Sequence, residues 1–449
     1  MSNSRLQVGF GKVEITPSVN CEMSGYVSRT GSCCGVHDPL WVRAIFLSDG
    51  ETEVVIAATD LIGLNRETIG QIRSAAAQLT GVAPQQIMIC AIHTHSGPVT
   101  LESAFLGEPD SGYLAELIEK VAVVILTAQQ NRRPAQTFVG QSICREIGKN
   151  RRIFGGPTDS DVMVLRFEQS DGQKIFLVNY ACHPVVLGPD NRLITADYPY
   201  YLHQELARIN PGCESLFING ACGDINTGHA AKDSIHNPGG SLRNFATAER
   251  LGRILAQQVN AADESAVELT EIKLKIAVSE LELDLEPLPT AADYRQQQLE
   301  WARQSRELKA TQADYGSIRQ TEVWSRWAQE MQCRAEAGNL RQYLTTEVAA
   351  IALGEIELVT FPGEFFHKLG MRIKENQPGK KVFILGYCND AIGYVATTEA
   401  YAQGGYEVED SYRYYGLPSR LAPGTGEQVV EAVITMLQKM RKEVTTDAT

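Results

Sequence analysis

The sequence has no apolar run long enough for a membrane span. The longest candidate, 121–128, is far shorter than the roughly 18 residues that a bilayer-crossing helix needs. The start of the chain, MSNSRLQVGFGKVEITPS, has no apolar stretch behind a basic one, so it does not resemble a secretory signal. We therefore expect a cytoplasmic protein with no stable membrane insertion.

Clusters of basic residues are also missing. The chain has 41 Lys and Arg against 54 Asp and Glu, a net charge of -13, and its densest basic stretch is the short one at 439–442. Nucleic acids and anionic membranes attract clustered Lys and Arg. The composition therefore argues against a nucleic-acid partner and favours a small-molecule substrate, while a homo-oligomer stays open.

One cysteine motif and one serine motif are absent. No C-x-x-C pair occurs among the ten cysteines, which argues against a structural zinc knuckle, and without an export signal we expect free thiols. No G-x-S-x-G motif occurs either, which removes the commonest serine-hydrolase pattern. Internal repeats and low-complexity segments are lacking too.

The 449 residues, 43% of them hydrophobic, alternate between strand-like and helix-like patterns. Period-2 or continuous apolar runs predict strands, and 3.6-residue spacing predicts helices. The expected strands are 54–59, 86–92, 162–167, 174–180 and 216–219; the expected helices are 66–79, 113–129 and 245–261. This order predicts an α/β fold with layered mixed β-sheets flanked by helices.

The pattern of apolar and polar residues changes between 262 and 349. A β-rich run at 268–286 leads into two polar helical stretches, 291–308 and 317–337. We interpret about 287–345 as a helical insertion or lid within a single domain that spans 1–449. Strands are then expected at 351–361 and 382–387, and a last amphipathic helix at 428–442.

Histidines follow two of the predicted strands. His93 and His95 end the apolar run that starts at Ile89, and residues two apart in a strand face the same side. His183 ends the run that starts at Val178. Each histidine alone could be a hydrogen-bonded core residue, but two such sites among eight histidines favour a metal.

A catalytic zinc needs a further oxygen, nitrogen or sulfur ligand and a position for water. Glu364 follows a strand and a Pro-Gly turn, which would hold its side chain in a fixed place. Taken alone this is weak, because Pro-Gly-Glu is also an ordinary turn.

Taken together, six motifs resemble the catalytic region of the neutral, non-lysosomal ceramidases, in the same order and over roughly 6–440. They are GKVEITP (11–17), HTHSGP (93–98), ACHP (181–184), NGACGD (219–224), FPGEFF (361–366) and GYVATTEAY (393–401). The resemblance implies a zinc ion held by His93, His183, Glu364 and Tyr394. It further implies that His95, Arg151 and Tyr406 stabilise the oxyanion, with Tyr406 twelve residues after Tyr394.

The resemblance implies an amidohydrolase in which metal-activated water attacks an N-acyl bond. The chain departs from the family at 223–228, where GDINTG replaces a Gly-Asp-Val-Ser-Pro-Asn loop, so a serine role is not expected. It is too short for the C-terminal immunoglobulin-like domain of ceramidases, which favours a smaller or more polar substrate.

Other functions stay open at this point. The bond could be an ester or lactone, or the chain could be a non-catalytic metal-binding member. Phosphoryl transfer fits poorly, because it favours a carboxylate-rich site with two metals. Four side chains have undecided roles, either at the site or in a turn: His37, Asp60, Asp197 and Asp224.

Overall fold

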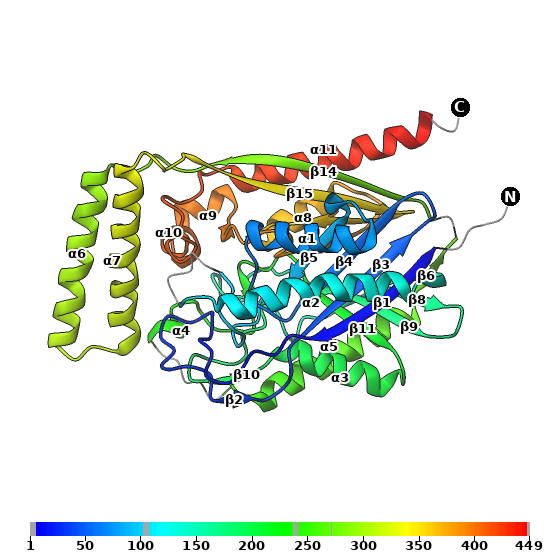
Figure 1. Cartoon of the computed structure of the whole chain (residues 1–449), viewed down its shortest axis with the longest axis horizontal. Helices are drawn as coiled ribbons and strands as arrows, with labels where there is room; N and C mark the ends of the chain where they lie inside the picture. Colours follow the sequence, from blue (N-terminus) through cyan, green and yellow to red (C-terminus); the bar gives the residue numbers. More distant parts are fainter. Residues whose placement is uncertain (1–5, 102–106, 237–239, 241, 271, 447–449) are drawn as a thin grey trace.

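The computed structural model describes residues 6–101, 107–236, 240, 242–270 and 272–446. Two β-sheets pack face to face and helices cover the outer face of each, so that the molecule has four layers (Figure 1). The predicted α/β class with layered mixed sheets is therefore confirmed.

The larger sheet has the strand order β11-β9-β8-β6-β1-β3-β4-β5, and β13 pairs with β6. The pairs β4–β5 and β9–β11 are parallel, while the other neighbours along this order are antiparallel. Its strands are β1 (Gln7–Glu14), β3 (Trp41–Ser48), β4 (Glu53–Thr59), β5 (Ile87–Ala91), β6 (Arg133–Ile143), β8 (Asp161–Gln169), β9 (Lys174–Tyr180), β11 (Glu214–Asn219) and β13 (Val267–Leu269).

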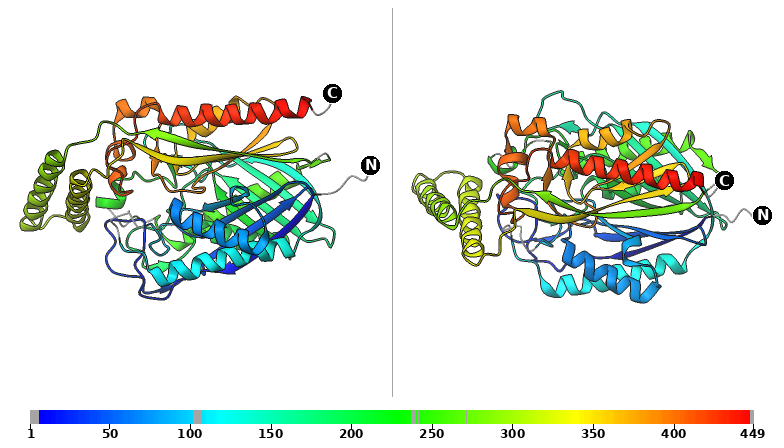
Figure 2. Two further views of the ribbon diagram at one scale, coloured as in Figure 1. Left: turned by 45° about the horizontal axis from the view of Figure 1, so that its top comes forward. Right: turned by 90° about the horizontal axis from the view of Figure 1, so that it is seen from above.

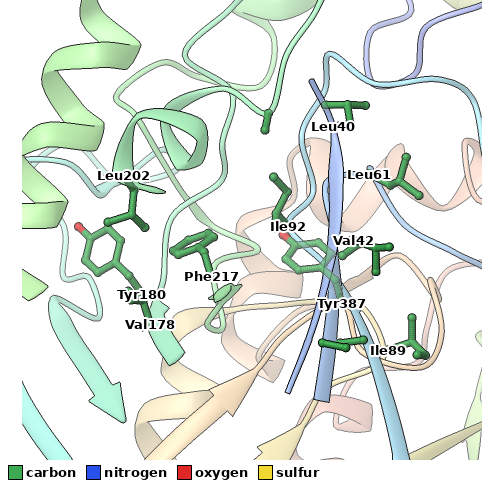
Figure 3. Close-up of a cluster of buried hydrophobic side chains, with 14 of the residues drawn as sticks. Leu40, Val42, Leu61, Ile89, Ile92, Val178, Tyr180, Leu202, Phe217 and Tyr387 are labelled. Carbon is green, nitrogen blue, oxygen red and sulfur yellow. The ribbon is translucent and has the colours of Figure 1, made fainter. Parts of the chain in front are cut away.

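Four helices bury their apolar stripes against the outer face of this sheet. They are α1 (Arg66–Thr80), α2 (Ser111–Gln130), α3 (Tyr198–Ile209) and α5 (Phe245–Glu264). Helix α1 begins where the side chain of Asn65 accepts from the Thr68 amide, and it ends at Gly81, whose φ of 78° suits a left-handed cap. Figure 3 shows part of the core beneath these helices, where Ile89, Phe217 and Tyr387 come together.

The smaller sheet has the order β14-β15-β16-β18. Its strands are β14 (Leu274–Asp284), β15 (Tyr343–Leu353), β16 (Ile356–Thr360) and β18 (Lys381–Leu385), and its outer face is covered by α8 (His367–Glu375) and α11 (Thr425–Thr446). Apolar side chains from the inner faces of both sheets form the central core, which joins the two halves of the chain into one packed body.

Most of the predicted elements are confirmed, with two exceptions, and some elements of the structure were not predicted. The stretch expected as one strand at 351–361 is a hairpin, because Gly354 with a φ of 60° turns the chain between β15 and β16. The run at 268–286 is two strands, β13 and β14, which belong to different sheets. Helix α3 was missed because Tyr and Pro residues open it, although Pro suits a first helical turn.

Two long helices, α6 (Ala291–Ala310) and α7 (Tyr315–Glu336), pack against each other and project from one end of the sheets (Figures 1 and 2). The two predicted polar helices are thus confirmed. They are anchored at their base: Trp327 Nε1 donates to the carbonyl of Leu417 at 2.9 Å, and the Tyr294 hydroxyl to that of Pro418 at 2.7 Å. In the described part of the chain, no helix combines the length and apolarity that crossing a bilayer requires.

Candidate metal centre

The ends of three strands meet at the side chain of Asn219, which is fully buried. Its Nδ2 donates to the carbonyl of Ile92 beyond β5, and the backbone carbonyl of Asn219 accepts from the Gly386 amide beyond β18 at 2.8 Å. The next amide, of Gly220, donates to the backbone carbonyl of Tyr180 at the end of β9 at 3.0 Å. The start of the NGACGD motif therefore draws both sheets together at one point.

His93 and His183 follow directly on these strand ends. His93 has a φ of 69°, an uncommon conformation for a residue with a side chain, and its amide is held by the Leu61 carbonyl at 2.9 Å. The amide of His183 donates to the Ile225 carbonyl at 3.1 Å. Both imidazoles are buried, with 2% and 0% of their surface exposed.

Glu364 comes from the other half of the chain, on the short strand β17 (Glu364–Phe365). This strand pairs in parallel with β19 (Tyr394–Val395), so Glu364 lies opposite Tyr394. The loop of Gly223 packs against it so closely that a Cβ there would lie 2.3 Å from the Glu364 carbonyl oxygen. Glycine in the NGACGD motif is thus required by the close approach of two backbones.

The three side chains converge. Oε2 of Glu364 lies 2.8 Å from Nε2 of His183 and 3.4 Å from Nε2 of His93, and one ligand atom from each residue lies within 4.8 Å of the others. Burial alone would raise the pKa of Glu364, but the two adjacent imidazoles outweigh it and hold that pKa well below its usual range. The carboxylate is therefore ionised in this site.

The other ring nitrogen of each histidine is already used. Nδ1 of His93 lies 2.6 Å from the Ile62 carbonyl, and Nδ1 of His183 lies 2.8 Å from that of Cys222. Carbonyls only accept, so Nδ1 of each ring carries a proton, and Nε2 is the nitrogen that faces Glu364 and is left for a metal ion. Metal-binding histidines are oriented in this way, and two imidazoles with a carboxylate are donors that suit zinc.

His95 faces the same space. Its Nε2 lies 3.2 Å from Nε2 of His93, and its buried Nδ1 has no hydrogen-bond partner in the described part of the chain. Burial, strengthened by His93 and His183, lowers the pKa of His95 well below its usual value, so this imidazole is neutral.

The remaining predicted residues form a second group beside the first. The Arg151 guanidinium lies 5.2 Å from the ring centre of Tyr394, donates to the Gly223 carbonyl at 2.7 Å, and pairs with Glu407 at 2.8 Å. The Tyr394 ring lies parallel to that of His183, with 6.5 Å between ring centres, and the Tyr406 ring lies 5.8 Å from that of Tyr394. All seven predicted side chains thus gather in one region.

Two tyrosines at this site were missed. Tyr415 donates its hydroxyl hydrogen to Oε1 of Glu364, and the Tyr387 hydroxyl lies 3.3 Å from Nε2 of His183. Seven tyrosines crowd 387–415, and only the twelve-residue spacing singled out Tyr394 and Tyr406. Proximity between other members of the group requires the fold.

The four undecided side chains stabilise the surroundings. Asp60 pairs with Arg43 at 2.9 Å, and Asp197 accepts from the Tyr198 amide at the start of α3. Asp224 accepts from Nδ1 of His367 at 2.7 Å rather than orienting a histidine of the site, and the His37 ring stacks on Phe245.

Several known proteins are similar to this chain in sequence. The family model of the neutral/alkaline non-lysosomal ceramidase N-terminal region matches residues 6–202. The neutral ceramidase of Pseudomonas aeruginosa is 24% identical over 477 residues, which covers 89% of this chain and 68% of that protein. Neutral ceramidase A of Dictyostelium discoideum is 23% identical over 46% of this chain and 32% of its own length.

The fold is shared with solved structures. The crystal structure of the Pseudomonas aeruginosa neutral ceramidase superposes with a TM-score of 0.73 at 19% identity, covering 98% of this chain and 75% of that one. A ceramidase complexed with C2 superposes with a TM-score of 0.72 at 18% identity, covering 98% and 76%. The chain is therefore ceramidase-like, resembling the neutral/alkaline non-lysosomal ceramidases along most of its length.

Proposed function

We propose that this protein is a zinc-dependent hydrolase that cleaves an amide-type N-acyl bond. The observation that carries the proposal is the convergence of two buried imidazole Nε2 atoms and an ionised carboxylate, each imidazole being fixed by a backbone carbonyl. The similarity to neutral ceramidases supports the choice of an amide bond.

In this proposal His93, His183 and Glu364 hold the ion and Tyr394 completes the set. A bound zinc ion would lower the pKa of water and polarise a carbonyl group. Tyr415 fixes the orientation of the carboxylate, because its hydroxyl donates to the Glu364 oxygen that faces away from the histidines. The chain thus holds each metal donor in one orientation within a buried site.

The neighbouring groups handle charge and protons. A neutral His95 can accept a proton at Nε2 and return it to the leaving nitrogen, in the manner of a general acid-base group. Arg151 and the Tyr406 hydroxyl are donors for the negative charge that develops on the carbonyl oxygen. Glu407 holds Arg151 in place, since its carboxylate pairs with both Arg151 and Arg152.

We also propose that the α6–α7 hairpin borders the substrate space. Trp324 of α7 packs with Val27, Ile235 and Tyr414, and Tyr406 lies against the same cluster. The hairpin therefore touches the segment that carries a proposed oxyanion donor.

The experiment combines metal analysis with hydrolysis. Protein purified without chelator should contain about one zinc ion per chain, and it should hydrolyse an N-acyl amine in a panel that includes the matched ester. His183→Ala should lose both zinc and turnover. His203→Ala is the matched control, because that histidine bonds to Ser215 outside the site and should keep both. Metal-free protein with full activity would overturn the proposal. A preference for the ester would show that the bond cleaved is an ester rather than an amide.

A further inference from the structure

We infer that Arg243 binds an anionic group of the substrate, a carboxylate carried by the N-acyl compound. The inference rests on the proposed function and adds a substrate class to it. It is carried by the contacts that lead from His95 through Tyr26 to Arg243.

The loop of Tyr26 packs directly on His95. The two ring centres are 4.9 Å apart, and Gly25, with a φ of 99°, lies so close that a Cβ there would be 2.5 Å from the His95 ring. Tyr26 is 7% exposed, and its hydroxyl donates to the Leu187 carbonyl at 2.7 Å. Tyr26 is therefore a fixed wall of the site next to the proposed acid-base group.

Two arginines flank the Tyr26 ring. The guanidinium carbons of Arg29 and Arg243 lie 5.0 Å and 5.5 Å from its centre. Arg29 is 8% exposed and donates to three backbone carbonyls, including that of His95 at 2.7 Å. Each of its three guanidinium nitrogens donates to a backbone carbonyl, so Arg29 supports the wall and leaves ligand binding to its neighbour.

Arg243 has no such set of strong partners. It donates to the Tyr26 hydroxyl at 3.0 Å, and to the Leu187 carbonyl and the Ser234 hydroxyl at 3.4 Å each, while its buried Nε has no partner in the described part of the chain. No carboxylate among the described residues lies within ion-pair distance of Arg243. By contrast, Arg151 and Arg152 both pair with Glu407.

Arg243 thus stands one side chain away from His95, because both pack against the Tyr26 ring. The other cation beside that ring is Arg29, whose charge adds to the positive potential around Arg243.

A carboxylate satisfies this arrangement. Guanidinium groups bind carboxylates through two parallel, charge-assisted hydrogen bonds, which are stronger than the neutral contacts that Arg243 makes now. Val27 of the Tyr26 loop and Ile235 of helix α4 (Asp233–His236) pack with Trp324 in a buried apolar cluster next to Arg243, so its fixed surroundings offer no carboxylate of their own. The proposed function supplies the N-acyl bond, and an N-acyl compound with an anionic amine portion is an N-acyl amino acid.

The test uses two probes of nearly equal shape, N-octanoylglycine and the uncharged N-octanoylglycinamide. The zinc-loaded wild type should show a kcat/KM roughly 10- to 100-fold higher for the acid, the range expected for a charge-assisted bond. Arg243→Gln should abolish that preference, mainly by raising KM for the acid until the acid-to-amide ratio of kcat/KM approaches one. Arg243→Lys should keep part of it. The matched control is Arg253→Gln on α5, an exposed arginine paired with Glu249, which should behave as wild type.

Calorimetric binding of both probes accompanies the kinetics. Equal kcat/KM and equal affinity for acid and amide in the wild type would overturn the inference while leaving the hydrolase proposal intact. If neither probe is hydrolysed, the hydrolase proposal fails for this substrate class, and binding then decides: tighter binding of the acid that Arg243→Gln removes supports the inference, and equal binding overturns it. Thermal unfolding of Arg243→Gln within a few degrees of wild type shows that the comparison concerns a folded protein.

Discussion

The ring of Tyr387 stacks on the ring of His93, with centres 4.2 Å apart and planes 22° from parallel. The same tyrosine has a φ of 54°, so its backbone is held in a left-handed conformation to place this ring. Its hydroxyl reaches both His183 and Cys222 at 3.3 Å. One buried side chain therefore supports both histidines of the site.

Substitution of Tyr387 should separate packing from hydrogen bonding. Tyr387→Ala removes a ring that is 5% exposed and should lower the free energy of unfolding by about 3–5 kcal/mol. Tyr387→Phe keeps the stacking and should cost only about 1–2 kcal/mol, the loss of one buried hydroxyl contact. Urea unfolding of both variants measures the difference. Equal losses in the two variants would show that the ring contributes nothing beyond its hydroxyl.

His93 and His95 should fail differently when each is replaced by alanine. His93→Ala should lose metal and activity together, because it removes a proposed ligand. His95→Ala should keep the metal and lose roughly 10²- to 10³-fold in turnover, the effect of deleting one acid-base group or oxyanion donor. Tyr406→Phe should resemble His95→Ala. Zinc content and turnover, measured on the same samples, distinguish the two roles. If His95→Ala lost the zinc while His93→Ala kept it, His95 would be the ligand and His93 the acid-base group or oxyanion donor.

Asp224 should stabilise the fold through His367. Its Oδ1 accepts from the His367 amide at 2.8 Å and its Oδ2 from Nδ1 at 2.7 Å, in a pair that is 4% and 3% exposed. Asp224→Asn replaces one acceptor by a donor and should cost about 1–3 kcal/mol of unfolding free energy. Asp171→Asn, which breaks a half-exposed pair with Arg133, is the control and should cost less than about 1 kcal/mol.

Asp390 should make stability depend on pH in an unusual direction. Burial raises its pKa to about 6, despite hydrogen bonds from the Ala391 amide and Thr346. The folded state then binds a proton more tightly than the unfolded chain, so the contribution of this group falls as pH rises from about 4 through 6. Relative to wild type, Asp390→Asn should gain about 1 kcal/mol between pH 5 and pH 7. Unfolding at both values, with Asp171→Asn as reference, tests this, and a constant difference would contradict it.

The sequence predicted the parts of this protein that depend on local patterns. The apolar runs before His93 and His183 correctly located the strand ends, and a period of 3.6 residues found α1 and α2. The motifs that resemble ceramidases supplied the order in which the site residues occur. These signals are carried by residues that are close in the chain.

What escaped prediction depends on contacts between distant segments. Tyr387 and Tyr415 looked like two more tyrosines in a crowded stretch, and only the fold brings their hydroxyls to His183 and Glu364. The two sides of Gly354 looked like one strand, because a single glycine in a β-rich run does not reveal a hairpin. The partner of Asp224 lies 143 positions away, so no local pattern could have identified it.

The meeting of both halves of the chain at Glu364 has a practical consequence for dissecting the protein. A fragment that ends between the sheets, near residue 270, would carry His93 and His183 but lack the carboxylate that lies between them. Two separately expressed pieces would therefore each lack part of the proposed ligand set. The complete set would form only when the two pieces reassemble. Metal uptake or turnover from mixed fragments would then report complementation rather than the folding of either piece.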